Sequence, residues 1–289
     1  MDRQREGIAL GLLVMAGWSF PGVFVRLMPD LVWHEATAVR LAIAMAATLP
    51  AALLHRRELR RAFDHPRVPG LALAMVAYYA TATAAFYNAP LGEVAVLIAS
   101  APAWAALWHY LHGHRDRLNE LYGAMVAIAG VAVVSIPSFG SRSPAPGYHP
   151  LGVFLAIASA VCAAVYAIGV GRLFADRRHP GSLPLAWLTF FLGTILLGFW
   201  TPAHTVRLLA EYWPQALALG VLSTAMPTVA FAAASERLPR GLTTIFNPAV
   251  AVTANLAAIL AIGEYPSWWA VPGGLLVLAG VVMTLRTKN

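Results

Sequence analysis

The sequence predicts an all-α membrane protein with ten transmembrane helices. The 289 residues are 59% hydrophobic and only 11% charged, whereas a soluble domain carries about 25% charged residues. The apolar residues also form long runs separated by charged, Pro-rich or Gly-rich links. Because a span needs about 20 such residues, the chain is long enough for roughly ten spans. No room is left for an appended soluble domain.

Ten apolar runs follow one another along the chain. Their ranges are 7–27, 36–54, 68–87, 91–112, 118–137, 150–171, 183–201, 214–235, 240–262 and 266–285. The interior of each run carries almost no Asp or Glu, as expected when a charge at mid-bilayer costs about 2.5–3.5 kcal/mol. The first run is long enough to span, so we expect no cleaved signal peptide. The single cysteine, Cys162, excludes a disulfide framework and a Cys-based metal site.

The basic residues divide unequally between the two faces that ten spans define. One face receives 16 of the 20, namely Arg3, Arg5, Arg56, Arg57, Arg60, Arg61, Arg67, Arg115, Arg117, Arg172, Arg177, Arg178, Arg237, Arg240, Arg286 and Lys288. The other face or its helix ends keep Arg26, Arg40, Arg142 and Arg207. The positive-inside rule therefore places both termini in the cytoplasm. The net charge of +7 is then a topology signal and does not indicate a nucleic-acid partner.

Short motifs recur between the two halves of the chain at similar offsets. The pairs are Arg26-Leu27-x-x-Asp30 with Arg172-Leu173-x-x-Asp176, Pro90-x-Gly92 with Pro239-x-Gly241, and Gly123-x6-Gly130 with Gly273-x6-Gly280. We therefore expect one five-helix unit used twice, in residues 1–140 and 148–289. Because five is odd, the two copies cross the membrane in opposite directions. Such an inverted repeat favours alternating access around a site near mid-membrane.

On these features the chain resembles the drug/metabolite transporter superfamily, in its ten-helix, EamA-type family. The resemblance covers essentially the whole chain, and it includes Gly263-Glu264 after the ninth run. The first half departs from that pattern, with His114 after Gly113. The resemblance implies that the first four helices of each half surround a central cavity. In character the chain is similar to bacterial exporters of aromatic amino acids and related small metabolites.

Polar and aromatic side chains at helical spacing within aliphatic runs are the candidates to line such a cavity. The expected substrate-binding set is Trp18, Tyr78, Tyr79, Thr83, Ser100, Trp104, Tyr166, Thr228, Phe231 and Asn247. Helix packing is the alternative for each, because small and hydroxylated residues also serve helix contacts in lipid. Asn247 has an additional argument, since Pro248 frees a backbone carbonyl that a polar cavity would satisfy.

Aromatic rings with few fixed charges favour a planar, amphipathic substrate that is neutral overall, such as an aromatic or other neutral amino acid. A sugar phosphate would require Lys or Arg inside the spans. Arg26 and Arg40 approach this position, near the outer ends of the first two runs. We expect both to snorkel to the membrane surface or to pair with Asp30 or Glu35.

Energy coupling and helix bending also follow from the sequence. Proton coupling normally requires a titratable group inside the membrane, but Glu93, Glu236 and Glu264 lie at the ends of runs or in loops. We therefore expect facilitated export, with proton-coupled antiport as the alternative. Pro102 and Pro248 interrupt the helix ladder and are candidate hinges, static kinks being the alternative.

Other protein classes fit the sequence less well. A membrane enzyme needs a catalytic constellation, and neither an Asp-rich motif nor a Cys nucleophile with a partner is evident. His112-x-His114 is too short for a metal site, and no segment resembles a channel filter. An enzyme therefore stays a distant alternative.

The resulting hypothesis is a bacterial multi-pass inner-membrane transporter that exports amino acids by alternating access. We expect it to need no cofactor and no metal, and to contact only its small-molecule substrate and the lipid bilayer. Because one chain already holds both repeats, a monomer is expected to work. Carriers of drugs, nucleotide sugars or lipid-like metabolites are the alternatives within the superfamily.

Overall fold

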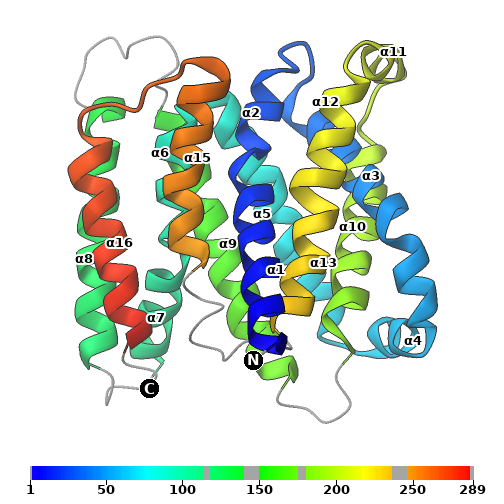
Figure 1. Cartoon of the computed structure of the whole chain (residues 1–289), viewed down its shortest axis with the longest axis horizontal. Helices are drawn as coiled ribbons and strands as arrows, with labels where there is room; N and C mark the ends of the chain where they lie inside the picture. The colour runs from blue at the N-terminus through cyan, green and yellow to red at the C-terminus, as the bar shows by residue number, and fades with distance from the viewer. Residues whose placement is uncertain (1, 113–117, 140–149, 175–179, 236–245, 287–289) are drawn as a thin grey trace.

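The computed structural model describes residues 2–112, 118–139, 150–174, 180–235 and 246–286, and every regular element in these ranges is a helix. The helices run side by side, with the first turns of α1 (Asp2–Ser19) and the last turns of α16 (Ala270–Arg286) at the same end of the bundle (Figure 1). We call this end the terminal end and the opposite one the distal end. The chain therefore begins and ends on the same side of the bundle.

The first half of the chain continues from α1 through a series of helices. They are α2 (Pro21–Arg26), α3 (Trp33–Leu54), α4 (Arg56–Asp64), α5 (Val68–Asn88), α6 (Leu91–Ala99), α7 (Ala101–Leu111) and α8 (Leu118–Phe139). Two predicted spans are each built from two helices, with breaks at Phe20 and at Ser100. A proline lies in the first turn after each break, where its missing N–H and its ring prevent a continuous ladder.

The second half repeats this layout with one irregular span. Its helices are α9 (Pro150–Phe174), α10 (Ser182–Gly198), α11 (His204–Glu211), α12 (Trp213–Leu217), the π-helix η1 (Ala218–Ala225), α13 (Met226–Ser235), α15 (Phe246–Ile262) and α16. The π-helix precedes Pro227, and Thr224 Oγ1 donates to the carbonyl of Leu219 at 2.8 Å. Such π-segments occur frequently at functional sites.

Length and composition support membrane crossing for most of these helices. Seven helical segments in the described residues are long and apolar enough to span. Three shorter apolar helices, Ser182–Gly198, Ala249–Ile262 and Ala270–Thr284, account for the other predicted runs. The count of ten spans and the cytoplasmic position of the termini therefore stay predictions.

Helices from the two halves pack in pairs: α1 with α13, α3 with α10, α5 with α9, and α8 with α16. In the last pair, a Cβ on Gly130 would lie 2.6 Å from the carbonyl oxygen of Gly273, and one on Gly123 would lie 2.7 Å from that of Gly280. The order of these contacts makes α8 and α16 antiparallel. The recurring Gly-x6-Gly motif thus lets two corresponding helices approach closely in opposite directions.

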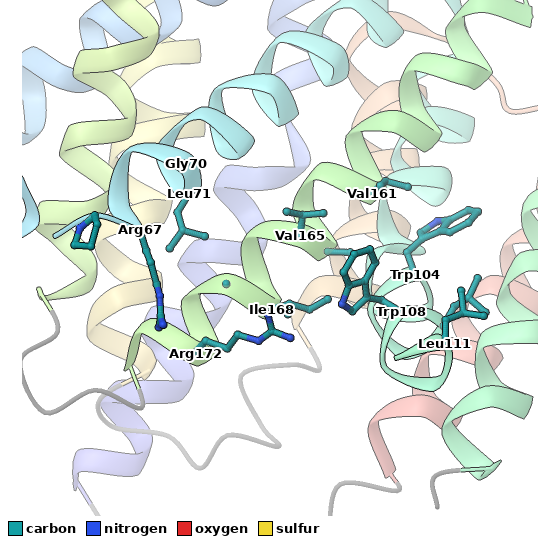
Figure 2. Close-up of a pocket in the computed structure, with 14 residues that line it drawn as sticks. Arg67, Gly70, Leu71, Trp104, Trp108, Leu111, Val161, Val165, Ile168 and Arg172 are labelled. Carbon is teal, nitrogen blue, oxygen red and sulfur yellow. The ribbon is translucent and has the colours of Figure 1, made fainter. Parts of the chain in front are cut away.

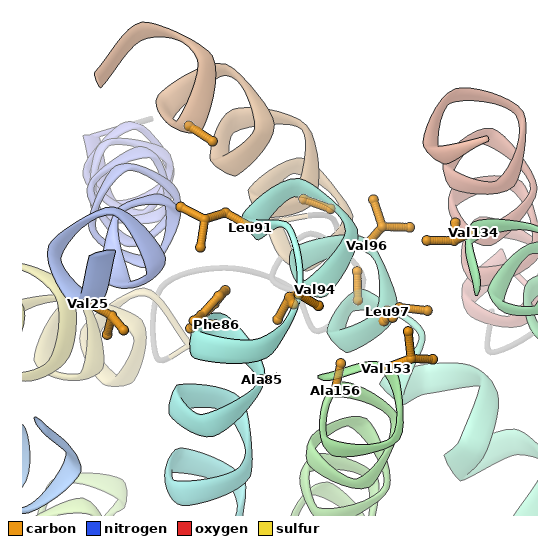
Figure 3. Packing of buried hydrophobic residues seen from close by; sticks show 14 of the residues in the cluster. Val25, Ala85, Phe86, Leu91, Val94, Val96, Leu97, Val134, Val153 and Ala156 are labelled. Atoms are coloured by element: carbon orange, nitrogen blue, oxygen red, sulfur yellow. The ribbon is translucent and has the colours of Figure 1, made fainter. Parts of the chain in front are cut away.

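The largest apolar core surrounds α6 (Figure 3). Leu91, Val94 and Leu97 of α6 are almost fully buried, and Phe86 of α5 and Val153 of α9 join them. This core joins helices from both halves of the chain.

Candidate functional site

A fully buried arginine lies near the centre of the bundle. Arg40 is seven residues into α3, about 10 Å from its distal end, and is only 4% exposed. Its Nε donates to Thr224 Oγ1 at 2.6 Å, and its Nη2 donates to the carbonyl of Ser223 at 3.5 Å. Its guanidinium carbon lies 4.7 Å from the ring centroid of Tyr79. The arginine is therefore held by hydroxyl, carbonyl and π-face contacts.

The expectation that Arg40 snorkels or pairs with a carboxylate is wrong. Glu35 Oε1 instead accepts from Thr205 Oγ1 at 2.9 Å and lies 3.3 Å from His204 Nε2. Asp30 accepts a hydrogen bond from the hydroxyl of Tyr212. In the described part of the chain, no ion pair involves Arg40. Its positive charge is thus unneutralised within the span.

Two predicted tyrosines stand next to Arg40. Tyr78 and Tyr79 on α5 have ring centroids 5.2 Å apart, and Tyr79 also lies 6.2 Å from Phe190 of α10. Tyr79 is eleven residues into α5, about 16 Å from Val68, which is roughly mid-bilayer. Thr228 lies near Tyr79. The structure thus brings together these residues of the expected substrate-binding set beside an arginine that the set did not include.

One face of the η1–α13 helix connects the polar and aromatic residues. Thr224, Thr228 and Phe231 follow at i, i+4 and i+7, the spacing of a single helical face. Thr224 contacts Arg40, Thr228 approaches Tyr79, and Phe231 lies 5.4 Å from Trp18 of α1, centroid to centroid. This face covers about 10 Å along the helix. We call Arg40, Tyr78, Tyr79, Thr224 and Thr228 the central cluster.

Thr83 lies on α5 with Tyr78 and Tyr79, and Tyr166 lies on α9, which packs on α5. Thr83 follows Tyr79 by one turn of α5 and is fully buried, and its hydroxyl has no hydrogen-bond partner among the described residues. Tyr166 of α9 packs against an apolar group with Leu71 and Trp187. Both remain candidates on position, but no hydrogen bond or ring contact in the described part ties either of them to Arg40.

Ser100 and Trp104 lie apart from the central cluster. Ser100 occupies the break between α6 and α7, where its Oγ donates to the carbonyl of Leu97 at 2.6 Å and accepts from Trp104 Nε1 at 3.0 Å. These bonds satisfy backbone and indole groups at the break, so packing explains them. Pro102 lies in the first turn of α7. Asn247 and Pro248 lie in the first turn of α15, and their side chains are outside the described residues.

The distal end of the bundle is closed by contacts between the halves. Arg26 pairs with Glu264 at 3.7 Å, and not with Asp30 or Glu35 as expected. The other Glu264 oxygen accepts from the backbone N–H of Leu91 at 2.5 Å. Asn255 of α15 donates to the carbonyl of Gly92 at 3.2 Å. In the described residues α15 packs on α6, α1 and α2, whereas α7 packs on α8, α9 and α16.

Gly263 positions Glu264 for this role. Its φ of +68° ends α15 in the left-handed region, and the N–H of Glu264 bonds the carbonyl of Ala258 at 3.2 Å. This 6→1 bond is the usual helix end at a glycine. The chain therefore turns back towards α6 directly after α15. The Gly-Glu pair was noted in the sequence as a motif, but its contacts required the structure.

The expected substrate-binding set left out Arg40, Ser223 and Thr224. A signal for Arg40 did exist: the apolar run begins at Trp33 rather than at residue 36, so Arg40 is two turns inside the span. The contact with Thr224 had no such signal, because 184 residues separate the two. Among the described residues, no three His, Cys, Asp or Glu side chains are placed to hold a metal ion.

The paired halves and the buried central cluster define a polytopic helical membrane protein built on an internal duplication. The model of the EamA-like transporter family matches residues 5–136 and 150–286, so the chain belongs to this family of membrane transporters. The family match covers both halves separately. It confirms the resemblance to the drug/metabolite transporter superfamily.

Two relatives and one solved structure span nearly the whole chain. A probable terminal-alkyne amino-acid exporter of Streptantibioticus cattleyicolor is 28% identical, covering 95% of this chain and 92% of its own. The uncharacterized transporter YdfC of Bacillus subtilis is 24% identical, covering 100% and 94%. A protein crystal structure that is 23% identical superposes with a TM-score of 0.63 over 98% of this chain and 97% of its own. This last likeness concerns the fold alone.

Proposed function

We propose that the protein exports amino acids, aromatic and other neutral ones, and that Arg40 binds their carboxylate. The observation that carries the proposal is a fully buried arginine with no carboxylate partner in the described residues. A charge at mid-bilayer costs about 2.5–3.5 kcal/mol or more, and such residues usually pair or mark a substrate pathway. A substrate carboxylate would supply the missing anion through charge-assisted hydrogen bonds.

The rest of the site suits the rest of an amino acid. The aromatic pair Trp18 and Phe231 lies about 10 Å along α13 from Thr224, where it would contact an apolar or aromatic side chain. Hydroxyls of Thr228 and Thr83 lie between or beside these groups. The expectation of a site without fixed charge is thereby revised: the substrate is neutral overall, yet its carboxylate meets a cation. The name of the Streptantibioticus relative supports an amino-acid substrate.

Alternating access is the proposed mechanism, with ten spans, two inverted units in residues 1–140 and 148–289, and both termini in the cytoplasm of a bacterial inner membrane. Support comes from the antiparallel α8–α16 pair and from the basic residues of the terminal end. In this proposed topology the distal end faces the outside, and the distal contacts support a state closed on that side. The break at Ser100 and Pro102 is the proposed hinge, and an unchanged transport rate in Pro102→Ala would remove that role.

Flux through proteoliposomes tests the proposed function. The assay is counterflow of radiolabelled phenylalanine and threonine into liposomes holding the purified protein. Arg40→Gln should lower the initial rate at low substrate by about 10- to 100-fold, since charge-assisted bonds contribute about 1.5–3 kcal/mol. Arg207→Gln, at an exposed arginine of α11, is the matched control and should transport normally.

Two results would overturn the proposal. One is the absence of saturable amino-acid flux in the wild-type protein, which would redirect the search to another metabolite of the superfamily. The other is wild-type flux in Arg40→Gln. Equal thermal unfolding of the two variants in detergent ensures that a lost flux reflects the site and not the fold. Uphill transport driven by a proton gradient would contradict the facilitated mode alone.

A further inference from the structure

A groove of about 560 Å³ lies at the terminal half of the bundle, apart from the central cluster. It is bounded by the start of α5, by α7 and by the last turns of α9 (Figure 2). Its lining is apolar except at one edge, and its volume falls in the range of small-molecule sites. Trp104, which we expected in the central cavity, lines this groove together with Trp108.

The groove faces outward from the bundle. On α9 its residues Val161 and Val165 are 38% and 46% exposed, and they continue a stripe that begins with exposed Leu151 and Phe154. Ser159 of the same helix lies on a different face and donates to the carbonyl of Tyr78 at 3.3 Å. An exposed apolar stripe along a spanning helix faces lipid, because water would disfavour it.

Two arginines stand at the polar edge of the groove. Arg67 directly precedes α5, and Arg172 is two residues before the end of α9, so both lie at the terminal end. Their side chains reach the same edge of the groove, and Trp104 and Trp108 lie across it (Figure 2). Both residues are exposed, and neither has an ion-pair partner in the part of the chain that the structure describes.

We propose that this groove binds an anionic phospholipid, with its phosphate on Arg67 and Arg172 and an acyl chain on Leu111, Val161, Val165 and Ile168. The charge and the depth of the groove both suit such a lipid. The arginines lie at the level of the headgroups, and the apolar part of the groove extends from them into the bilayer. Basic clusters at the cytoplasmic level attract anionic lipids. The groove borders α7, so the bound lipid packs against the helix that follows the Ser100 break.

Native mass spectrometry of the detergent-solubilised protein, titrated with dioleoyl-phosphatidylglycerol or dioleoyl-phosphatidylcholine, tests this site. The wild type should bind the anionic lipid more tightly. Arg67→Gln with Arg172→Gln should weaken that binding about 25-fold, about five-fold per arginine, and leave phosphatidylcholine unchanged. Arg56→Gln with Arg57→Gln, at exposed arginines of α4 on the same end, should bind as the wild type does.

A second variant tests the apolar part of the site. Val165→Trp fills the apolar part of the groove at an exposed position, where it does not disturb the core, and should lower the affinity for phosphatidylglycerol. The proposal is overturned if the two lipids bind equally to the wild type, or if the double arginine variant or Val165→Trp keeps wild-type affinity. It is also overturned if glycerol phosphate competes as well as the lipid, which would indicate a plain anion site. These readouts do not depend on transport.

Discussion

Glu264 bridges the two halves of the chain at the distal end of the bundle, so in the proposed alternating-access cycle its replacement should favour the outward-open state. Its carboxylate joins Arg26 at the end of α2 to the first backbone N–H of α6. All of these contacts connect the two halves of the chain. Glu264→Ala removes them together, whereas Glu264→Gln keeps an acceptor oxygen for Leu91 and loses only the charge.

The size of the effect follows from these contacts. The side chains of Arg26 and Glu264 are 27% and 25% exposed, and such an ion pair contributes about 0.2–1 kcal/mol. A hydrogen bond to a charged acceptor contributes about 1.5–3 kcal/mol, part of which water replaces at a site this exposed. For Glu264→Ala we expect the closed state to lose about 2 kcal/mol of stability, which raises the open population about 30-fold. For Glu264→Gln we expect about 1 kcal/mol, or about five-fold.

Cysteine labelling in nanodiscs measures that population. The reporter is Ala258→Cys in a Cys162→Ala background, because Ala258 is 1% exposed and shares a face of α15 with Asn255. Maleimide labelling should be slowest with Glu264 intact, faster in Glu264→Gln and fastest in Glu264→Ala. Glu211→Ala, at an exposed carboxylate of α11, should label like its parent. Equal rates in all four proteins would refute a closing role for Glu264.

Three further predictions follow. Gly130→Ala should destabilise the detergent-solubilised protein by about 1–3 kcal/mol, because the new Cβ meets backbone atoms of α16 at 2.6 Å. Gly171→Ala, facing open space, should stabilise the protein or leave thermal unfolding unchanged. The same result for both variants would contradict the packing argument. Trp18→Ala should lower phenylalanine flux by up to about tenfold while sparing threonine, since ring contacts contribute about 0.5–1.5 kcal/mol; equal losses would argue against an aromatic subsite. The hydrogen bond to Asp30 raises the pKa of Tyr212 to about 12. The contribution of this bond to stability is therefore complete below pH 10 and is lost as the pH rises towards 12. Ultraviolet titration, with Tyr212→Phe as the reference, should show a lower tyrosine pKa in Asp30→Ala, and an unchanged pKa would exclude this bond.

The fold was predictable because its signals are local or repeated. Apolar runs predicted the positions of the helices, and Pro102 predicted a disturbance that the structure shows as a break at Ser100. The Gly-x6-Gly motifs indicated a duplication, which the family match to residues 5–136 and 150–286 supports, and Gly123 and Gly130 meet their counterparts in α16. Such patterns depend on spacing along one helix, which a sequence displays directly.

The site was only partly predictable because its contacts are long-range. Stripes on α5 and α13 singled out Tyr79 and Thr228, because each shares a helix face with other candidates; their role in substrate binding stays a prediction. Spacing could not show that Arg40 crosses from α3 to Thr224, or that Trp104 turns outward to the groove. The helix begins at Trp33 and not at residue 36, an error of almost one turn that made Arg40 look like a residue of the membrane surface.

Binding of phenylalanine and phenylalaninamide to the wild type and to Arg40→Gln tests the central claim most directly. The amide replaces the carboxylate by a neutral carboxamide of nearly the same size. If Arg40 binds the carboxylate, the wild type should prefer phenylalanine by about tenfold or more, and Arg40→Gln should lose this preference. An equal preference in both proteins would contradict the assignment of Arg40 as the carboxylate-binding residue.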